Sequence, residues 1–148
     1  MSKTWFITGA GSGIGAGIAR AALKAGDRVV ATGRNLDKVR AALSDVANGN
    51  VAYVQLDVAD EAQAKAAVEE AVKQFGRIDV AVNNAGYALM GNFEELPTAD
   101  LEQQFATNFW GVAYVMRAVL PVMRQRRSGR IINISSVAGV VGLSLIHI

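Results

Sequence analysis

The stretch TGAGSGIG (residues 8–15) decides the fold expected of this chain of 148 residues. It directly follows a short apolar run, KTWFI (residues 3–7), and opens a segment of helical period over residues 13–25. Glycines permit a tight turn, and the free N–H groups at a helix start attract a pyrophosphate. The stretch therefore predicts a dinucleotide site between a strand and a helix. A glycine turn that binds no ligand is the alternative, because the match to G-x-G-x-x-G/A is weak by itself.

Short β-rich runs alternate with longer Ala-rich segments along the rest of the chain. After KTWFI, the runs that predict strands are RVVAT (28–32), VAYVQL (51–56), IDVAVN (78–83) and RIINIS (130–135). They are nearly continuous in apolar residues, as is typical of parallel strands covered on both faces. The alternation predicts an α/β fold with a doubly wound, Rossmann-like parallel sheet in the order 3-2-1-4-5. Such sheets bind ligands beyond the carboxyl ends of their strands, where the order reverses.

The longest predicted helix covers residues 98–127. Pro97 precedes it, and Thr98 is expected to cap it. Its apolar stripe consists of Leu101, Phe105, Val112, Met116 and Val119. Pro121 is expected to end or kink this helix, because proline lacks the N–H that a helix interior needs. The preceding helix is expected to start beside Asp60, since an acid favours a helix N-terminus.

Composition narrows the classes of function. Fifteen Lys and Arg against thirteen Asp and Glu give a formal net charge of +2, which is too balanced to predict a nucleic-acid partner. The basic cluster RQRRSGR (124–130) is interpreted as a solvated helix end, with a phosphate or lipid contact as the alternative. The chain has no cysteine, so disulfides and thiol nucleophiles are excluded, and no metal site is predicted. Too few apolar residues precede Thr8 for a signal-peptide core, so a cytoplasmic location is expected.

A more specific spacing lies within the same glycine stretch. Thr8, Gly9, Gly13 and Gly15 match TGxxxGxG, a motif in which the chain resembles the short-chain dehydrogenase/reductase family. The extended branch of that family uses TGxxGxxG, and Ser12 stands where that branch needs glycine. The resemblance is therefore to the branch with TGxxxGxG.

The ends of the third and fourth predicted strands agree with the family in order and spacing. Asp57-Val58 stands where the family's Asp contacts the adenine ring, although an ordinary strand-ending Asp is the alternative. NNAG (residues 83–86) resembles the motif that supports the sheet and lines the cofactor ribose. The resemblance implies the following cofactor contacts: Gly9, Ser12, Gly13, Ile14 and Gly15 at the pyrophosphate, Asp57 and Val58 at the adenine, and Asn84, Ala85 and Gly86 at the ribose region.

Two further positions match the family's catalytic residues. Asn108 lies within the long predicted helix, an unfavourable place for a short amide without a partner. It matches the catalytic Asn, which is thought to hold a water in a proton relay. The catalytic serine of the family stands just before VAG, which is Ser136 here, with Ser135 as the less favoured assignment.

The end of the second predicted strand bears on the choice of cofactor. Gly33 stands where NAD-preferring relatives carry an acid for the ribose 2′-hydroxyl. Arg34 follows it, and a guanidinium offers a planar fork of donors to a 2′-phosphate. NADP is therefore preferred, with NAD possible, and a solvated loop cation is the alternative interpretation of Arg34.

The sequence lacks the family's catalytic pair YxxxK. Its tyrosines, Tyr53, Tyr87 and Tyr114, have no lysine four residues on. The family spacing from Ser136 places the missing tyrosine one position beyond Ile148. A positioned general acid or base contributes about 10²–10⁴ in rate, so the printed chain is expected to be inactive.

The last residues, LSLIHI (143–148), allow three interpretations. They are also the translation of CTGTCTCTTATACACATC, the end of a common sequencing adapter. We therefore expect the family domain over residues 1–143 and a non-native tail over residues 144–148. A natural terminus and a membrane anchor built from the uncharged residues 131–148 are the alternatives.

The prediction for the whole is the N-terminal portion of an oxidoreductase that transfers a hydride between NADP(H) and a carbonyl or alcohol substrate. Its partners are expected to be that small molecule and, in the full-length parent, further copies of itself, with no nucleic acid or membrane. The alternatives are a non-catalytic nucleotide-binding sensor or regulatory protein and a membrane-tethered reductase. The substrate and the reaction direction do not follow from the sequence.

Overall fold

The structure is a computed structural model that describes residues 2–139, so the predicted tail over residues 144–148 lies outside the described residues. At its centre is a five-stranded parallel sheet in the order β3-β2-β1-β4-β5. The strands are β1 (Thr4–Ile7), β2 (Arg28–Gly33), β3 (Val51–Gln55), β4 (Val80–Asn83) and β5 (Arg130–Asn133). The predicted order and the parallel pairing are confirmed.

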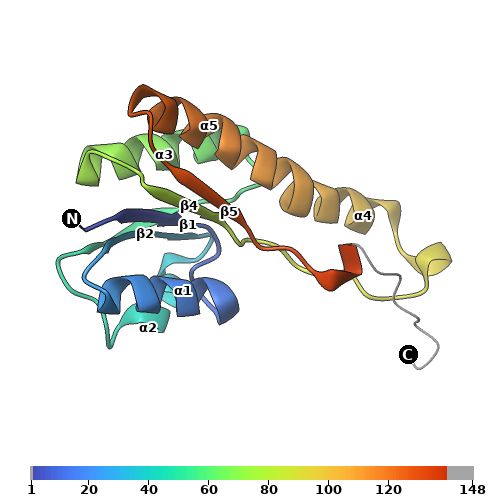
Figure 1. Cartoon of the computed structure of the whole chain (residues 1–148). Helices are drawn as coiled ribbons and strands as arrows, with labels where there is room; N and C mark the ends of the chain where they lie inside the picture. The colour runs from blue at the N-terminus through green and yellow to red at the C-terminus, as the bar shows by residue number, and fades with distance from the viewer. Residues whose placement is uncertain (1, 140–148) are drawn as a thin grey trace.

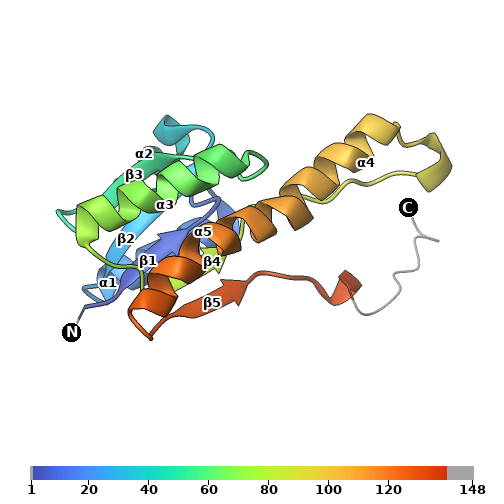
Figure 2. The ribbon, with the colours of Figure 1, turned by 90° about the horizontal axis from the view of Figure 1, so that it is seen from above.

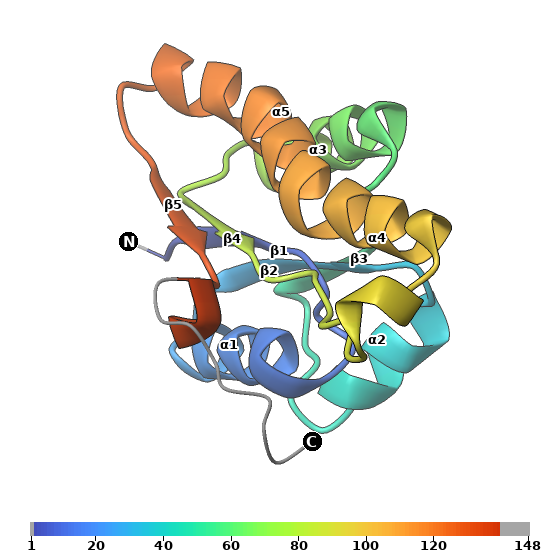
Figure 3. The ribbon, with the colours of Figure 1, turned by 90° about the vertical axis from the view of Figure 1, so that its right-hand side faces the viewer.

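Helices cover both faces of the sheet. Figure 1 shows α1 (Gly13–Lys24) and α2 (Leu36–Leu43) below it, and α3 (Glu61–Phe75) and α5 (Gly111–Gln125) above it. The view from the side in Figure 3 shows the same two layers. Successive residues of a strand face opposite sides of the sheet. In β1, Phe6 packs in the core with α3 and α5, and Ile7 packs in the core with α1 and α2. The strands are apolar at consecutive positions because both faces of the sheet are covered.

The long predicted helix is present but not uniform. It consists of α4 (Thr98–Phe105), a π-helical segment η2 (Ala106–Trp110) and α5. Figure 2 shows α4 as a continuation of α5 that extends away from the sheet. Phe105, predicted on the buried stripe, is 64% exposed, and α4 has no buried residue, whereas Val119 of α5 is buried.

Two details of that helix differ from the prediction. Pro121 does not end it, since α5 continues to Gln125. Pro121 and Arg117, whose carbonyl loses its helical partner, are both exposed, so water can satisfy that carbonyl. Thr98 is the first helical residue and Pro97 occupies the cap position, without a side-chain hydrogen bond to the helix start.

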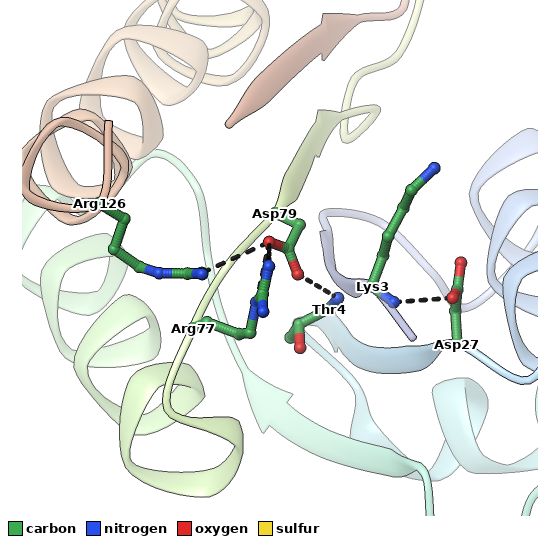
Figure 4. Close-up of polar contacts among 6 residues, drawn as sticks. All are labelled: Lys3, Thr4, Asp27, Arg77, Asp79 and Arg126. Carbon is green, nitrogen blue, oxygen red and sulfur yellow. Dashed lines mark hydrogen bonds and ion pairs between the residues drawn. The ribbon is translucent and has the colours of Figure 1, made fainter. Parts of the chain in front are cut away.

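An ionic cluster fastens the edge of the sheet where the strands begin. The Asp79 carboxylate accepts a hydrogen bond from the Thr4 N–H at 2.8 Å and from Arg77, and Arg126 of the α5 end lies 3.4 Å away (Figure 4). The Asp79 side chain is 10% exposed. Burial is the largest single influence and raises its pKa, but the hydrogen bonds from Arg77 and Thr4 and the two cationic charges together hold the pKa of Asp79 below its ordinary value.

A second carboxylate joins the same edge. Asp27, at the start of β2, accepts hydrogen bonds from the Lys3 N–H and from the Trp5 indole, both at 2.8 Å. The amino ends of β1, β2 and β4 are thereby linked by charged hydrogen bonds that do not reach the opposite edge. Within residues 2–139, no helix is both long enough and apolar enough to cross a membrane.

Candidate functional site

A cleft of about 1110 Å³ opens at the carboxyl ends of the strands, where the sheet order reverses between β1 and β4. It is bordered by the turn after β1, the loops after β2, β3 and β4, the segment η2 and the residues after β5. The predicted site residues that line it are Gly9, Ser12, Gly13, Ile14, Arg34, Asp57, Val58, Asn84, Ala85, Gly86, Asn108 and Ser136. Loops far apart in the sequence therefore meet at the predicted edge.

The glycine turn after β1 is fixed by main-chain hydrogen bonds to its neighbours. The Thr8 N–H donates to the Val82 carbonyl at 3.0 Å, and the Ala10 N–H donates to the Thr32 carbonyl at 2.9 Å. Gly9 takes a φ of 67°, in the region where a side chain is strained. The turn thus runs over the ends of β2 and β4 with a backbone path that needs glycine.

Gly15 has a different place from the other glycines of the motif. It is buried in the first turn of α1 and does not line the cleft. A Cβ added there would lie 2.4 Å from the Asn84 Nδ2 atom and 2.4 Å from the Gly9 carbonyl oxygen. Gly15 therefore lets α1 approach the turn closely, so its effect on a ligand would come through the shape of the turn.

The start of α1 differs from the starts of α2 and α3. Asn35 caps α2 by accepting from the Lys38 N–H at 3.0 Å, and Asp60 caps α3 by accepting from two main-chain N–H groups. At α1, the Ser12 side chain makes no capping hydrogen bond, and the first turn contains no acid. The N-terminal amides of α1 are thus available to an anion in the cleft.

The motif after β4 is tied to the glycine turn by side-chain hydrogen bonds. The Thr8 hydroxyl accepts from the N–H groups of Asn84 at 2.9 Å and Ala85 at 3.0 Å, and it donates to the Val82 carbonyl at 3.3 Å. In return, the Asn84 amide donates to the carbonyls of Thr8 at 2.9 Å and Gly9 at 3.2 Å. Asn84 therefore holds the two walls of the cleft together.

The loops after β2 and β3 form the far rim of the cleft. Arg34 is exposed, and its carbonyl accepts from the Gln55 amide at 3.3 Å. Asp57 accepts from the Ala59 N–H at 3.1 Å through its carboxylate. Val58 is nearly buried and packs into the core as well as lining the cleft. Lys38, which the sequence reasoning did not single out, also lines this rim.

Asn108 has the partner that its place in a helix requires. Its Nδ2 atom donates to the Tyr87 carbonyl at 2.7 Å, and its Oδ1 atom accepts from the Tyr87 N–H at 3.1 Å. It lies in the π-helical segment η2, an irregularity that is frequent at functional sites. The contact holds the loop after β4 against η2, and Tyr87 itself lines the cleft.

The serines after β5 also line the cleft. Ser135 and Ser136 both line the cleft, so both remain candidates for the catalytic position. The Ser136 hydroxyl oxygen accepts from the Ala138 N–H at 3.2 Å, at the start of the short helix η3 (Val137–Gly139). No group of three or more His, Cys, Asp or Glu side chains within residues 2–139 is arranged to hold a metal ion.

Comparison with known proteins places this arrangement in a family. The family model described as short chain dehydrogenase matches residues 3–147. The chain is 44% identical over 142 residues to the oxidoreductase BOA17 of Botryotinia fuckeliana, covering 96% of this chain and 52% of that protein. The chain thus spans about half the length of the curated relatives it matches.

Solved structures agree in fold. A short-chain dehydrogenase from Streptomyces avermitilis superposes with a TM-score of 0.90 at 37% identity, covering 97% of this chain and 53% of that one. ElxO with NADP bound superposes with a TM-score of 0.89 at 37% identity, covering 97% of this chain and 59% of that one.

Proposed function

Because the chain belongs to the short-chain dehydrogenase family, we propose that it is the cofactor-binding portion of an oxidoreductase that transfers a hydride between NADP(H) and a carbonyl or alcohol. The observation that carries the proposal is the single cleft that joins an uncapped helix start, a basic rim and the side chains of Asn108 and Ser136. A ligand that spans it would meet an uncapped helix start, a basic side chain, and hydroxyl and amide groups.

The residues present fit a nicotinamide dinucleotide. The uncapped amides of Gly13 and Ile14 suit its pyrophosphate. Gly9 lies close to Ala85 and Gly86 lies close to Asn108, so both positions need glycine for these parts of the cleft wall to meet. Asp57 and Val58 would contact the adenine, and Asn84, Ala85 and Gly86 the ribose region. When bound, the nicotinamide supplies the group that gives or takes the hydride.

The chain's own polar groups would act on the substrate oxygen. The Ser136 hydroxyl donates a hydrogen bond to that oxygen as charge develops on it. Asn108 holds the Tyr87 loop against the cleft, and the family resemblance implies that it would support a water in proton transfer. The chain has no Tyr-x-x-x-Lys pair to move the proton, so we propose that it binds nucleotide with little or no turnover.

The rim favours NADP over NAD in this proposal. Gly33 offers no carboxylate that would repel a 2′-phosphate, and the exposed Arg34 can present two parallel donors to it. NADP in the related ElxO structure agrees with this choice of cofactor class. We further propose a cytoplasmic protein whose full-length parent forms homo-oligomers and acts on a small molecule.

Calorimetric titration of the purified chain tests the proposal. NADPH is expected to bind more tightly than NADH, and Arg34→Gln is expected to weaken NADPH by about tenfold while changing NADH little. Absence of binding by either nucleotide at millimolar concentration would reject the function.

A non-catalytic nucleotide-binding sensor is the second candidate function. Sequencing of the source DNA across codon 143 separates the two. A stop directly after codon 148 in authentic genomic sequence, together with nucleotide binding and no turnover, supports the sensor. Continuation into a coding region with Tyr-x-x-x-Lys supports the oxidoreductase.

A further inference from the structure

The loop between α2 and β3 contains the only asparagine of the chain that is followed by glycine, Asn48-Gly49. Both residues are exposed to solvent. The loop lies at the amino edge of the sheet, since the Asn50 carbonyl accepts from the Val29 N–H of β2 at 2.8 Å. It does not line the cleft at the carboxyl edge, so the proposed function gives it no role.

The Asn48 side chain is folded back onto the main chain that follows it. Its Oδ1 atom accepts from the Asn50 N–H at 2.9 Å, and its main-chain carbonyl accepts from the Val51 N–H at 3.3 Å. Short polar side chains make such bonds in turns. The Asn48 Cγ atom and the Gly49 nitrogen both belong to the ring of atoms that the first hydrogen bond closes. A covalent bond between these two atoms would form a succinimide.

Two features of the loop favour that covalent bond. The Asn50 N–H already donates to the oxygen on which negative charge would develop when the Gly49 nitrogen attacks Cγ, and a donor so placed stabilises the charge. Gly49 has no side chain to obstruct the attack or to restrict the rotation of the main chain. Asn50 in the same loop lacks the second feature, because the β-branched Val51 follows it.

We propose that Asn48 is a site of spontaneous covalent modification, at which the asparagine is converted to aspartate and isoaspartate through a succinimide. The Gly49 nitrogen gives its proton to water and bonds to Asn48 Cγ, and the side-chain nitrogen leaves as ammonia. Water then adds to either carbonyl of the succinimide, and the ring opens to one of the two products. The conversion consumes one water and releases one ammonia, with no oxidation or reduction.

The two products are expected to differ in their effect on the fold. Isoaspartate carries the main chain through Cβ and Cγ, so it lengthens the chain just before the edge strand β3, where Val51 pairs with Val29. It is therefore expected to lower the temperature of unfolding. Aspartate keeps the ordinary peptide link and is expected to change that temperature little. Each product adds one negative charge at the edge away from the cleft.

The test is incubation of the full chain at physiological temperature in mildly alkaline buffer, followed by peptide mass mapping. Isoaspartate is measured by labelling with a protein-isoaspartate methyltransferase. Asn48 is expected to convert before the other asparagines and to give both products. Gly49→Ala is expected to lose most of the conversion and to keep the fold, because a Cβ there would meet nothing within 4 Å. Gly17→Ala is the matched control, since its Cβ also meets nothing within 4 Å, and it is expected to convert at Asn48 like the unsubstituted chain.

Several outcomes would overturn the proposal. One is conversion of Asn48 at the same rate in Gly49→Ala and in the unsubstituted chain. Another is formation of aspartate without isoaspartate, because direct hydrolysis of the amide passes through no succinimide. A third is an Asn48 that stays intact while other asparagines convert. Circular dichroism follows the fold during incubation, and conversion that begins only after the fold is lost would also overturn the proposal. Asn48→Asp supplies the standard for the aspartate product.

Discussion

The two edges of the sheet use their polar groups in opposite ways. At the amino edge, Asp79 and Asp27 both accept hydrogen bonds from β1, and the charge of Asp79 is matched by Arg77 and Arg126. At the carboxyl edge, the start of α1 has no cap, and Arg34 faces the cleft without an ion pair among the described residues. The first edge therefore matches a buried charge within the fold, whereas the second leaves a helix start and a cation open to the cleft.

The largest expected effect comes from filling the close contact at the carboxyl edge. Gly15→Ala places a Cβ 2.4 Å from the Gly9 carbonyl and the Asn84 amide. Because backbone must move, the free energy of unfolding is expected to fall by about 3 kcal/mol, and the affinity for NADPH by about 100-fold. Urea denaturation and calorimetric titration measure the two.

Gly17→Ala is the matched control for that substitution. Gly17 lies in the same helix, and a Cβ there would meet nothing within 4 Å. Alanine favours helix over glycine, so this variant is expected to gain about 0.5–1 kcal/mol and to bind nucleotide normally. If both glycine substitutions weakened binding alike, the close contact at Gly15 would not be the cause.

The next largest effect is expected at the amino edge. Asp79→Asn removes the charge that faces Arg77 and Arg126, and it is expected to lower the free energy of unfolding by about 2–3 kcal/mol. Nucleotide affinity should remain unchanged, because the cluster lies at the edge away from the cleft. Glu69→Gln, which breaks the exposed pair with Lys65, is the control and is expected to cost less than about 0.5 kcal/mol. A loss of nucleotide binding in Asp79→Asn would contradict the division between the edges.

A smaller effect is expected where the carboxyl edge also serves the fold. Thr8→Val removes the hydroxyl that accepts from the N–H groups of Asn84 and Ala85. The unfolding free energy is expected to fall by about 1–2 kcal/mol, since two partly buried donors lose their acceptor. Nucleotide affinity should fall with it, because the glycine turn and the loop after β4 are no longer joined. Thr8→Ser keeps the hydroxyl and should restore most of both.

The smallest effect is expected from lowering the pH. The pKa of Asp79 is below its ordinary value, so its ionised form is favoured by folding. The contribution is present above the unfolded-state pKa, about 3.9, and is lost as the pH falls through the lower folded-state pKa. The difference in stability between the unsubstituted chain and Asp79→Asn should therefore be constant near neutral pH and shrink below about pH 4. Urea denaturation at a series of pH values measures it, and a constant difference down to pH 2 would contradict the assigned pKa direction.

The sheet and the glycine turn were predictable because their signals are local. Apolar runs of strand length, separated by helical segments, specify parallel strands covered on both faces, and the TGxxxGxG spacing places the turn at the start of α1. The cap at Asp60 was predictable for the same reason, since a cap acts within three residues.

The features that the sequence reasoning missed depend on contacts between distant segments. The π-helical segment forms where the Asn108 amide meets the Tyr87 backbone, a pairing across 21 residues that no periodicity reveals. Lys38 reaches the cleft because α2 packs beside the glycine turn. The available signal for it was a basic residue four positions after Arg34 in the sequence.

The π-helical segment η2 also limits how many residues this part of the chain can contain. An α-helix repeats every 3.6 residues, and a turn with i→i+5 hydrogen bonds contains one residue more than its neighbours. Deleting one residue from Ala106–Trp110 would leave both flanking helices able to form. It would also remove the extra residue of the segment in which the Asn108 amide meets the Tyr87 backbone. Related chains are thus expected to tolerate exchanges of side chain in this segment more readily than changes in its number of residues.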